Sequence, residues 1–138
     1  MPLNRFLEIT KALSDRSRVR ALAALRDGEL CLCHLVTLLD LAPSTLSQHM
    51  NLLFSAKLVE RRKEGRWHWF RLAGPRAPAD SRRAVEAALA AVDRDPEIEQ
   101  DRRKLRALSR IDREELTACY RTCADRSAAA PGQEGVVR

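Results

Sequence analysis

The sequence has no apolar run that approaches the roughly 18–20 residues that a membrane-spanning helix requires. Its first residues, MPLNRFLEITKAL, are amphipathic and include Glu8, which is unlike an export signal. We therefore expect a cytoplasmic protein with no membrane partner. A reducing cytosol disfavours structural disulfides, so the cysteines are expected to serve as metal or redox ligands. These residues are Cys31, Cys33, Cys119 and Cys123.

Motifs that would indicate an enzyme are also missing. Thiol-based reductases commonly use a phosphate-binding Cys-x5-Arg loop. The residues six positions after the cysteines are Thr37, Leu39, Asp125 and Ala129, and none of them is arginine. The sequence contains neither a Ser/His/Asp set nor a Gly-rich phosphate loop. We therefore expect a protein that is not an enzyme.

What the sequence does contain is an excess of positive charge. It has 25 Lys and Arg against 19 Asp and Glu, a net charge of +6. This balance favours an anionic partner, with nucleic acid the first candidate. The length of 138 residues fits one domain, and dimerisation would add stability to its small core.

The spacing of apolar residues predicts two helices at the N-terminus. The first covers residues 3–13. Ser14 or Asp15 is expected to cap the second, and Asp27-Gly28 to end it. The arginines expected on the solvent side of the second helix are Arg16, Arg18, Arg20 and Arg26.

The next stretch predicts a helix–turn–helix. One helix runs from about Leu30 to Leu39, and Pro43 occupies the first position of the next, where its missing N–H has no cost. The outward face of that second helix is short, uncharged and rich in hydrogen-bonding groups, as expected for reading base edges. The residues of this helix expected to contact DNA are Ser44, Thr45, Ser47, Gln48, His49 and Asn51.

A basic β-hairpin follows. Its strands are expected at 58–63 and 66–72, around a turn at Glu64-Gly65. The expected phosphate or minor-groove contacts at its tip are Arg61, Arg62, Lys63 and Arg66. His68 shares a face with Phe70 and Leu72, so we expect it to pack in the core. The predicted fold is mostly α with a small β-hairpin, a winged helix-turn-helix.

The rest of the chain is predicted to support a dimer. After the Pro-rich segment 73–80, an alanine-rich helix at 81–92 suggests close packing against a symmetry mate. A further helix begins at Pro96, with a break near Arg110. This gives three regions: residues 1–75 form the DNA-binding winged helix-turn-helix, 76–126 the dimerisation helices with Cys119 and Cys123, and 127–138 a disordered tail.

Four segments resemble those of a known family. KALSDRSRVRALAAL, ELCLCHL, STLSQHMNLL and KEGRWHWFRL are similar to the ArsR/SmtB metal- and metalloid-responsive repressors, over roughly residues 5–75. ELCxCxL in particular resembles the metal-binding motif of the arsenic- and cadmium-responsive branches. The resemblance implies a homodimer that binds double-stranded operator DNA and represses its own resistance operon until an inducer binds.

The sequence departs from this family at one ligand position. In the arsenic-responsive branch a third cysteine often follows three residues after the second, where this chain has Val36. Cys119 and Cys123 lie four residues apart, on one helical face, and are candidates to complete the site. The alternative is that both are small buried residues of a dimerisation helix. His34, next to Cys33, is expected to face solvent rather than the ion.

The Cys-x-Cys spacing suggests how ion binding could release DNA. Residues two apart on a helix lie about 200° apart around its axis. Sulfurs on one ion lie within about 4 Å of each other. We therefore predict that Cys31 and Cys33 bind one ion only if the start of their helix unwinds or tilts. A helix N-terminus also favours the thiolate form.

The expected inducer is As(III) or Sb(III), whose lone pair suits three thiolates. Four thiolates would instead suit Cd(II), Pb(II) or Zn(II), and the ligand count leaves that alternative open. A third alternative is a repressor that senses oxidation through disulfides of the same cysteines.

Overall fold

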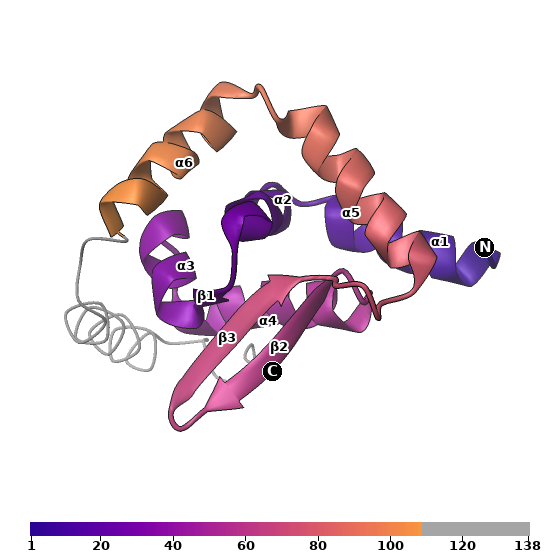
Figure 1. The fold of residues 1–138 in the computed structure, drawn as a ribbon, viewed down its shortest axis with the longest axis horizontal. Coiled ribbons are helices and arrows are strands. Elements are labelled where there is room, and N and C mark those ends of the chain that lie inside the picture. The colour runs from indigo at the N-terminus through magenta and orange to yellow at the C-terminus, as the bar shows by residue number, and fades with distance from the viewer. Residues whose placement is uncertain (109–138) are drawn as a thin grey trace.

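A computed structural model describes residues 1–108 of the chain. Its elements are α1 (Leu3–Leu13), α2 (Arg16–Ala24), the 3₁₀ turn η1 (Leu25–Asp27), β1 (Leu30–Cys31), α3 (Leu32–Leu39), α4 (Pro43–Ser55), β2 (Val59–Glu64), β3 (Trp67–Leu72), α5 (Ala79–Val92) and α6 (Pro96–Leu108). In Figure 1, α5 and α6 arch around α2, and the β2–β3 hairpin extends from the opposite side. The expectations for Cys119, Cys123, the break near Arg110 and the tail at 127–138 lie outside the described residues.

Local signals place the helix ends as the sequence predicts. Asp15 is the N-cap of α2, where its carboxylate accepts a hydrogen bond from the Arg18 backbone N–H at 3.1 Å. Pro43 begins α4. Asp40 ends α3 in the left-handed region, at φ 53°, a conformation that aspartate tolerates better than most residues.

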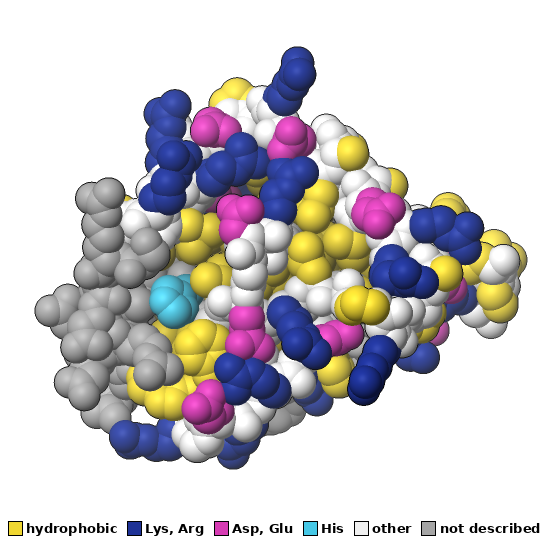
Figure 2. Space-filling view, in the orientation of Figure 1, with side chains coloured by type: hydrophobic (Ala, Val, Ile, Leu, Met, Phe, Trp, Pro, Cys, Tyr) yellow, Lys and Arg dark blue, Asp and Glu magenta, His cyan; other side chains and the backbone are white. Residues whose placement is uncertain are grey.

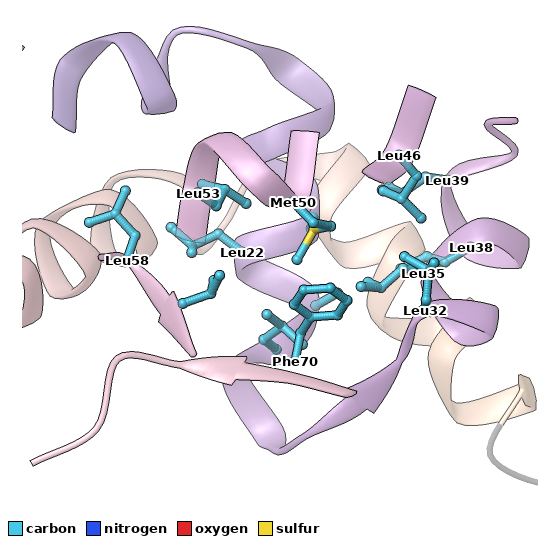
Figure 3. Packing of buried hydrophobic residues seen from close by; sticks show 14 of the residues in the cluster. Leu22, Leu32, Leu35, Leu38, Leu39, Leu46, Met50, Leu53, Leu58 and Phe70 are labelled. Atoms are coloured by element: carbon cyan, nitrogen blue, oxygen red, sulfur yellow. The ribbon is translucent and has the colours of Figure 1, made fainter. Parts of the chain in front are cut away.

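The core lies between α2, α3, α4 and the sheet. Figure 3 shows Met50 of α4 pointing toward Phe70 of β3, with leucines from α2, α3 and α4 around them. The largest fully buried side chains include Leu22, Leu25, Leu35, Leu46, Met50, Leu53 and Leu58. This packing fixes α4 against α3 and β3, which positions the outward face of α4 beside the hairpin.

The strands form a three-stranded antiparallel sheet in the order β1–β3–β2. Leu30 pairs with Phe70 and Cys31 with Trp69. The prediction that the third helix starts at Leu30 is therefore wrong by two residues. Leu30 and Cys31 are extended because β3, which is distant in the sequence, offers them backbone hydrogen-bonding groups.

The hairpin forms as predicted, with its turn one residue later. Glu64 pairs with Trp67, which leaves Gly65 and Arg66 in the turn. Gly65 has φ 61°, in the left-handed region that glycine enters without a steric cost. Winged helix-turn-helix architecture, mostly helical with a small sheet, is confirmed.

Of the arginines expected on the solvent side of α2, Arg16 is 77% exposed, whereas Arg18 and Arg20 are partly buried by contacts within the chain. Arg20 donates two hydrogen bonds to Asp101 of α6, both at 2.8 Å, and Asp101 is 4% exposed. Arg18 donates to the Ala12 carbonyl oxygen at 2.8 Å. For Arg20 the expectation was wrong because helix periodicity describes one helix in isolation, whereas α6 brings Asp101 to this face from 81 residues away in the sequence.

Exposed apolar side chains gather in parts of the surface rather than being spread evenly over it. Figure 2 shows hydrophobic side chains in the middle of one face, with Lys and Arg around its margin. On α1, Leu3 is 71% exposed, and Phe6 and Leu7 are about half exposed. The alanine-rich side of α5 packs partly against the chain's own core through Val85 and Leu89, which are buried. Within residues 1–108, we find no helix with the length and apolarity of a membrane span.

Candidate thiolate site and DNA-facing surface

Two buried thiols lie at the junction of β1 and α3. Cys31 ends β1 and is also the N-cap of α3, while Cys33 lies in the first turn. The Cys33 backbone N–H donates to Cys31 Sγ at 3.3 Å, so sulfur takes the role that a Ser or Asp oxygen usually has at a helix start. Both residues are at most 3% exposed.

His34 is part of the same cluster. Its Nδ1 accepts a hydrogen bond from the Cys31 backbone N–H at 3.2 Å and lies 4.0 Å from Cys33 Sγ. The two sulfurs and a His34 ring nitrogen all lie within 4.8 Å of one another. The expectation that His34 faces solvent is wrong, because the third residue of a helix can turn its side chain back onto the N-cap.

The geometry also corrects the predicted release mechanism. Cys31 has φ −72° and ψ 152°, so it is extended and not helical. The angle of about 200° that separates positions i and i+2 of a helix does not apply to this pair. The thiols are already near each other beside a regular α3, and the argument that ion binding must unwind the helix start is wrong.

The two thiols share one proton near neutral pH. A hydrogen bond with the Cys33 thiol lowers the pKa of Cys31 to about 5, although burial opposes this shift, and a hydrogen bond with the His34 side chain acts in the same direction. The same hydrogen bond and burial raise the pKa of Cys33. The pair therefore offers one thiolate, and an ion that binds both sulfurs must displace one proton.

Within residues 1–108, the structure adds no further cysteine to this cluster. Val36, where the resemblance implies a third cysteine, is buried at 2% exposure in the core. Cys119 and Cys123 lie outside the described residues, so their part in the site stays a prediction.

The expected DNA-contacting residues line one surface. The outward residues of α4 are partly exposed, namely Ser44, Thr45, Ser47, Gln48 and Asn51, and those of the hairpin are exposed, namely Arg61, Arg62, Lys63 and Arg66. Between them lies a cleft of about 520 Å³ with polar and basic walls, and Leu32 and Phe70 also line it. The recognition helix and the wing thus form one continuous face.

The two histidines of this region have different surroundings. His68 is exposed and lines this cleft, so its predicted core position is wrong. Strand alternation had placed it beside Phe70, but the hairpin extends past the core at that point. His49, expected to contact DNA, lies with Nδ1 3.1 Å from Arg18 Nη1 and 3.9 Å from Asp15. Burial lowers the pKa of His49, which favours its neutral form.

Several wing arginines are already held by neighbours. Arg61 donates to Asn51 at 3.0 Å, and its guanidinium lies 3.9 Å from the centre of the Phe54 ring. Phe54, near the end of α4, is 37% exposed beneath it. Arg62 donates to both carboxylate oxygens of Glu29, at 2.8 and 2.7 Å, and to Glu64 at 2.7 Å.

Comparison with known proteins agrees with this architecture. Residues 15–61 match the model of the bacterial regulatory proteins of the arsR family. The chain is 35% identical over 83 residues to the arsenical resistance operon repressor of Escherichia coli K12, covering 59% of this chain and 70% of that protein. The chain belongs to the arsR family. It is also 45% identical over 64 residues to the arsenical resistance operon repressor of Staphylococcus aureus.

Coverage of the relatives is partial. The match to the Staphylococcus aureus repressor covers 46% of this chain and 62% of that protein, less than two thirds. Among solved structures, a homodimeric winged helix-turn-helix DNA-binding domain from Mycobacterium bovis is 28% identical. It has a TM-score of 0.56 and covers 66% of this chain and 81% of its own length. The part matched by the family model, residues 15–61, includes both thiols and the whole of α4.

Proposed function

We propose that this chain is a homodimeric, DNA-binding transcriptional repressor that leaves its operator when a thiophilic ion binds Cys31 and Cys33. The observation that carries the proposal is the position of the two thiols at the start of α3, where Cys31 is the N-cap and pairs with β3 of the wing, and α3 itself packs against the recognition helix α4. Ion binding in that position can favour one conformation of the DNA-binding face, which is how a ligand shifts an equilibrium.

In this proposal α4 enters the major groove and the wing contacts phosphates. Gln48 and Asn51 would read bases, and Lys63 and Arg66 would add affinity independent of sequence. The exposed apolar residues of α1, including Leu3 and Phe6, would lie in the dimer interface, since exposed apolar clusters commonly mark such surfaces.

The proposed inducer is As(III) or Sb(III), held by Cys31, Cys33 and a third thiolate from Cys119 or Cys123. The names of the arsenical resistance repressors support this choice. The buried thiolate at Cys31 supplies the deprotonated sulfur that such an ion requires.

The experiment is a titration of arsenite, antimonite and Cd(II) against the protein bound to DNA from upstream of its own gene. We expect release from the wild-type protein and none from Cys31→Ser or Cys33→Ser. Loss of release in Cys119→Ser or Cys123→Ser would support the third thiolate. A wild-type response in both would exclude either residue as a required ligand.

The DNA-facing assignment has its own test. Gln48→Ala should weaken cognate binding by about 1–3 kcal/mol, because a bidentate contact to a base is lost, and leave random DNA little affected. Arg66→Ala should weaken both alike and reduce the salt dependence. Equal losses on cognate and random DNA for Gln48→Ala would contradict base reading by this residue.

The position of His34 favours a second candidate, a repressor that responds to Cd(II), Pb(II) or Zn(II). Two sulfurs and an imidazole nitrogen within 4.8 Å form a donor set suited to a divalent thiophilic metal. His34→Ala should then lower Cd(II) affinity about tenfold or more and leave arsenite affinity unchanged. His68→Ala, which removes an exposed histidine outside the cluster, is the matched control.

A further inference from the structure

The segment that carries Cys31 is joined to the wing by the sheet. Cys31 pairs with Trp69 on β3, and Trp69 pairs in turn with Arg62 on β2. Directly opposed residues of adjacent antiparallel strands point to the same face. Cys31, Trp69 and Arg62 therefore form one row across the sheet, from a buried thiol to an exposed arginine of the wing.

Side chains reinforce this row. Glu29, two residues before Cys31, accepts hydrogen bonds from Arg62 Nε and Nη2 at 2.8 and 2.7 Å. The Arg62 guanidinium carbon lies 5.3 Å from the centre of the Trp69 ring, which in turn lies 6.4 Å from that of His34. The thiol segment thus holds the wing through backbone pairing and through a two-bond ion pair.

Resting on the function proposed above, we propose that Glu29 is a positioning residue that couples ion binding at Cys31 and Cys33 to the wing through Arg62. The two sulfurs and a His34 ring nitrogen lie within 4.8 Å of one another, so one ion can bind both sulfurs. Such an ion restricts Cys31, which is the last residue of β1. The restriction acts on the segment that carries Glu29 and, through Glu29, on Arg62.

The sheet offers ion binding a route to DNA that does not require α3 to unwind. Arg62 is held by two carboxylates, so a displacement of Glu29 alters both the position and the local charge of a wing arginine. Coupling of this kind is reciprocal, so DNA bound at the wing also weakens ion binding. If ion binding acted on DNA affinity only through the contact of α3 with α4, Glu29 would not influence the coupling.

The test compares two wing ion pairs in the full-length chain. Glu29→Gln keeps the shape of the side chain and removes its charge. Glu60→Gln is the matched control, because Glu60 bonds Arg71 at 2.7 Å and joins β2 to β3 without including a residue of β1. Hydrogen–deuterium exchange of residues 59–72 is measured with and without arsenite or Cd(II), and DNA affinity is measured in parallel.

We expect the ion to change exchange in the wing of the wild-type protein and of Glu60→Gln, and to change it much less in Glu29→Gln. The factor by which the ion weakens DNA binding, about 5–150 in coupled systems, should fall by half or more in Glu29→Gln. Ion affinity without DNA should stay the same, since Glu29 is outside the donor set. A merely structural role would lower DNA affinity equally with and without the ion.

The possible failures are distinct. The coupling proposal is overturned if the ion changes exchange in the wing of Glu29→Gln as much as in the wild type, or if it does not change exchange in the wild-type wing. The proposed repressor function still stands in either case if the ion releases the wild-type protein from DNA. A Glu29-dependent wing response without DNA release supports the coupling and contradicts the proposed function.

Discussion

An arginine–carboxylate ion pair lies on each side of the core, one toward α6 and one toward the wing, and the two pairs differ in burial. On the α6 side, Arg20 donates two hydrogen bonds to Asp101, and both side chains are largely buried. On the wing side, Arg62 donates two hydrogen bonds to Glu29, but the Arg62 side chain is about half exposed. Removing one partner of a buried ion pair leaves a buried charge and strongly destabilises the fold. The partners of an exposed pair can instead form hydrogen bonds with water, so breaking that pair changes the stability little. The α6 side is therefore built to stay fixed, and the wing side is able to move.

The largest effect is expected from breaking the buried pair. Asp101→Asn removes the carboxylate that accepts two hydrogen bonds from Arg20, whose side chain is 15% exposed, and leaves Glu97 at 3.7 Å as its acidic neighbour. It should lower the free energy of unfolding by about 3 kcal/mol, measured by urea denaturation. The control is Arg16→Gln, which removes the ion pair of a 77% exposed side chain with Glu97, and its expected change is within about 0.5 kcal/mol. Similar losses in both variants would remove the distinction between the two sides.

An intermediate effect is expected at the thiols on the wing side. Cys33→Ala removes the hydrogen bond that most lowers the pKa of Cys31, so that pKa should rise from about 5 toward its ordinary value. A wild-type thiolate persists as the pH falls and is protonated near pH 5. In Cys33→Ala the thiolate should already be lost at higher pH. Thiolate absorbance near 240 nm reports both titrations, and an unchanged midpoint would contradict the shared-proton arrangement.

The smallest effect is expected from the exposed wing pair. Glu29→Gln should leave the urea midpoint within the error of the measurement, because Arg62 keeps Glu64 and gains water. Its effect should appear only in the ion-dependent behaviour of the wing. A loss of stability like that of Asp101→Asn would show that Glu29 supports the fold itself.

Most of the fold could be predicted from the sequence because its signals are local. Asp15, Pro43 and Gly65 each fix a cap, a helix start or a turn through their own chemistry, and apolar spacing located the helices. The winged helix-turn-helix, the two thiols and the basic hairpin could all be predicted from such signals.

The errors concern contacts between distant segments. Nothing in Leu30 or Cys31 alone indicates that β3 will pair with them, and Asp101 is not recognisable from α2 as the partner of Arg20. The missed strand led directly to the wrong release mechanism, because it makes Cys31 extended. His34 could have been found from its place as the third helix residue after an N-cap cysteine.

The most direct test of the central claim uses the protein without both thiols. Operator binding is measured by fluorescence anisotropy for the wild-type chain and for Cys31→Ser/Cys33→Ser, with arsenite, antimonite or Cd(II) added in turn. The account predicts that the wild-type protein leaves the DNA on addition of at least one of these ions, and that the double variant stays bound with all three. Release of the double variant by the ion that releases the wild type would contradict it.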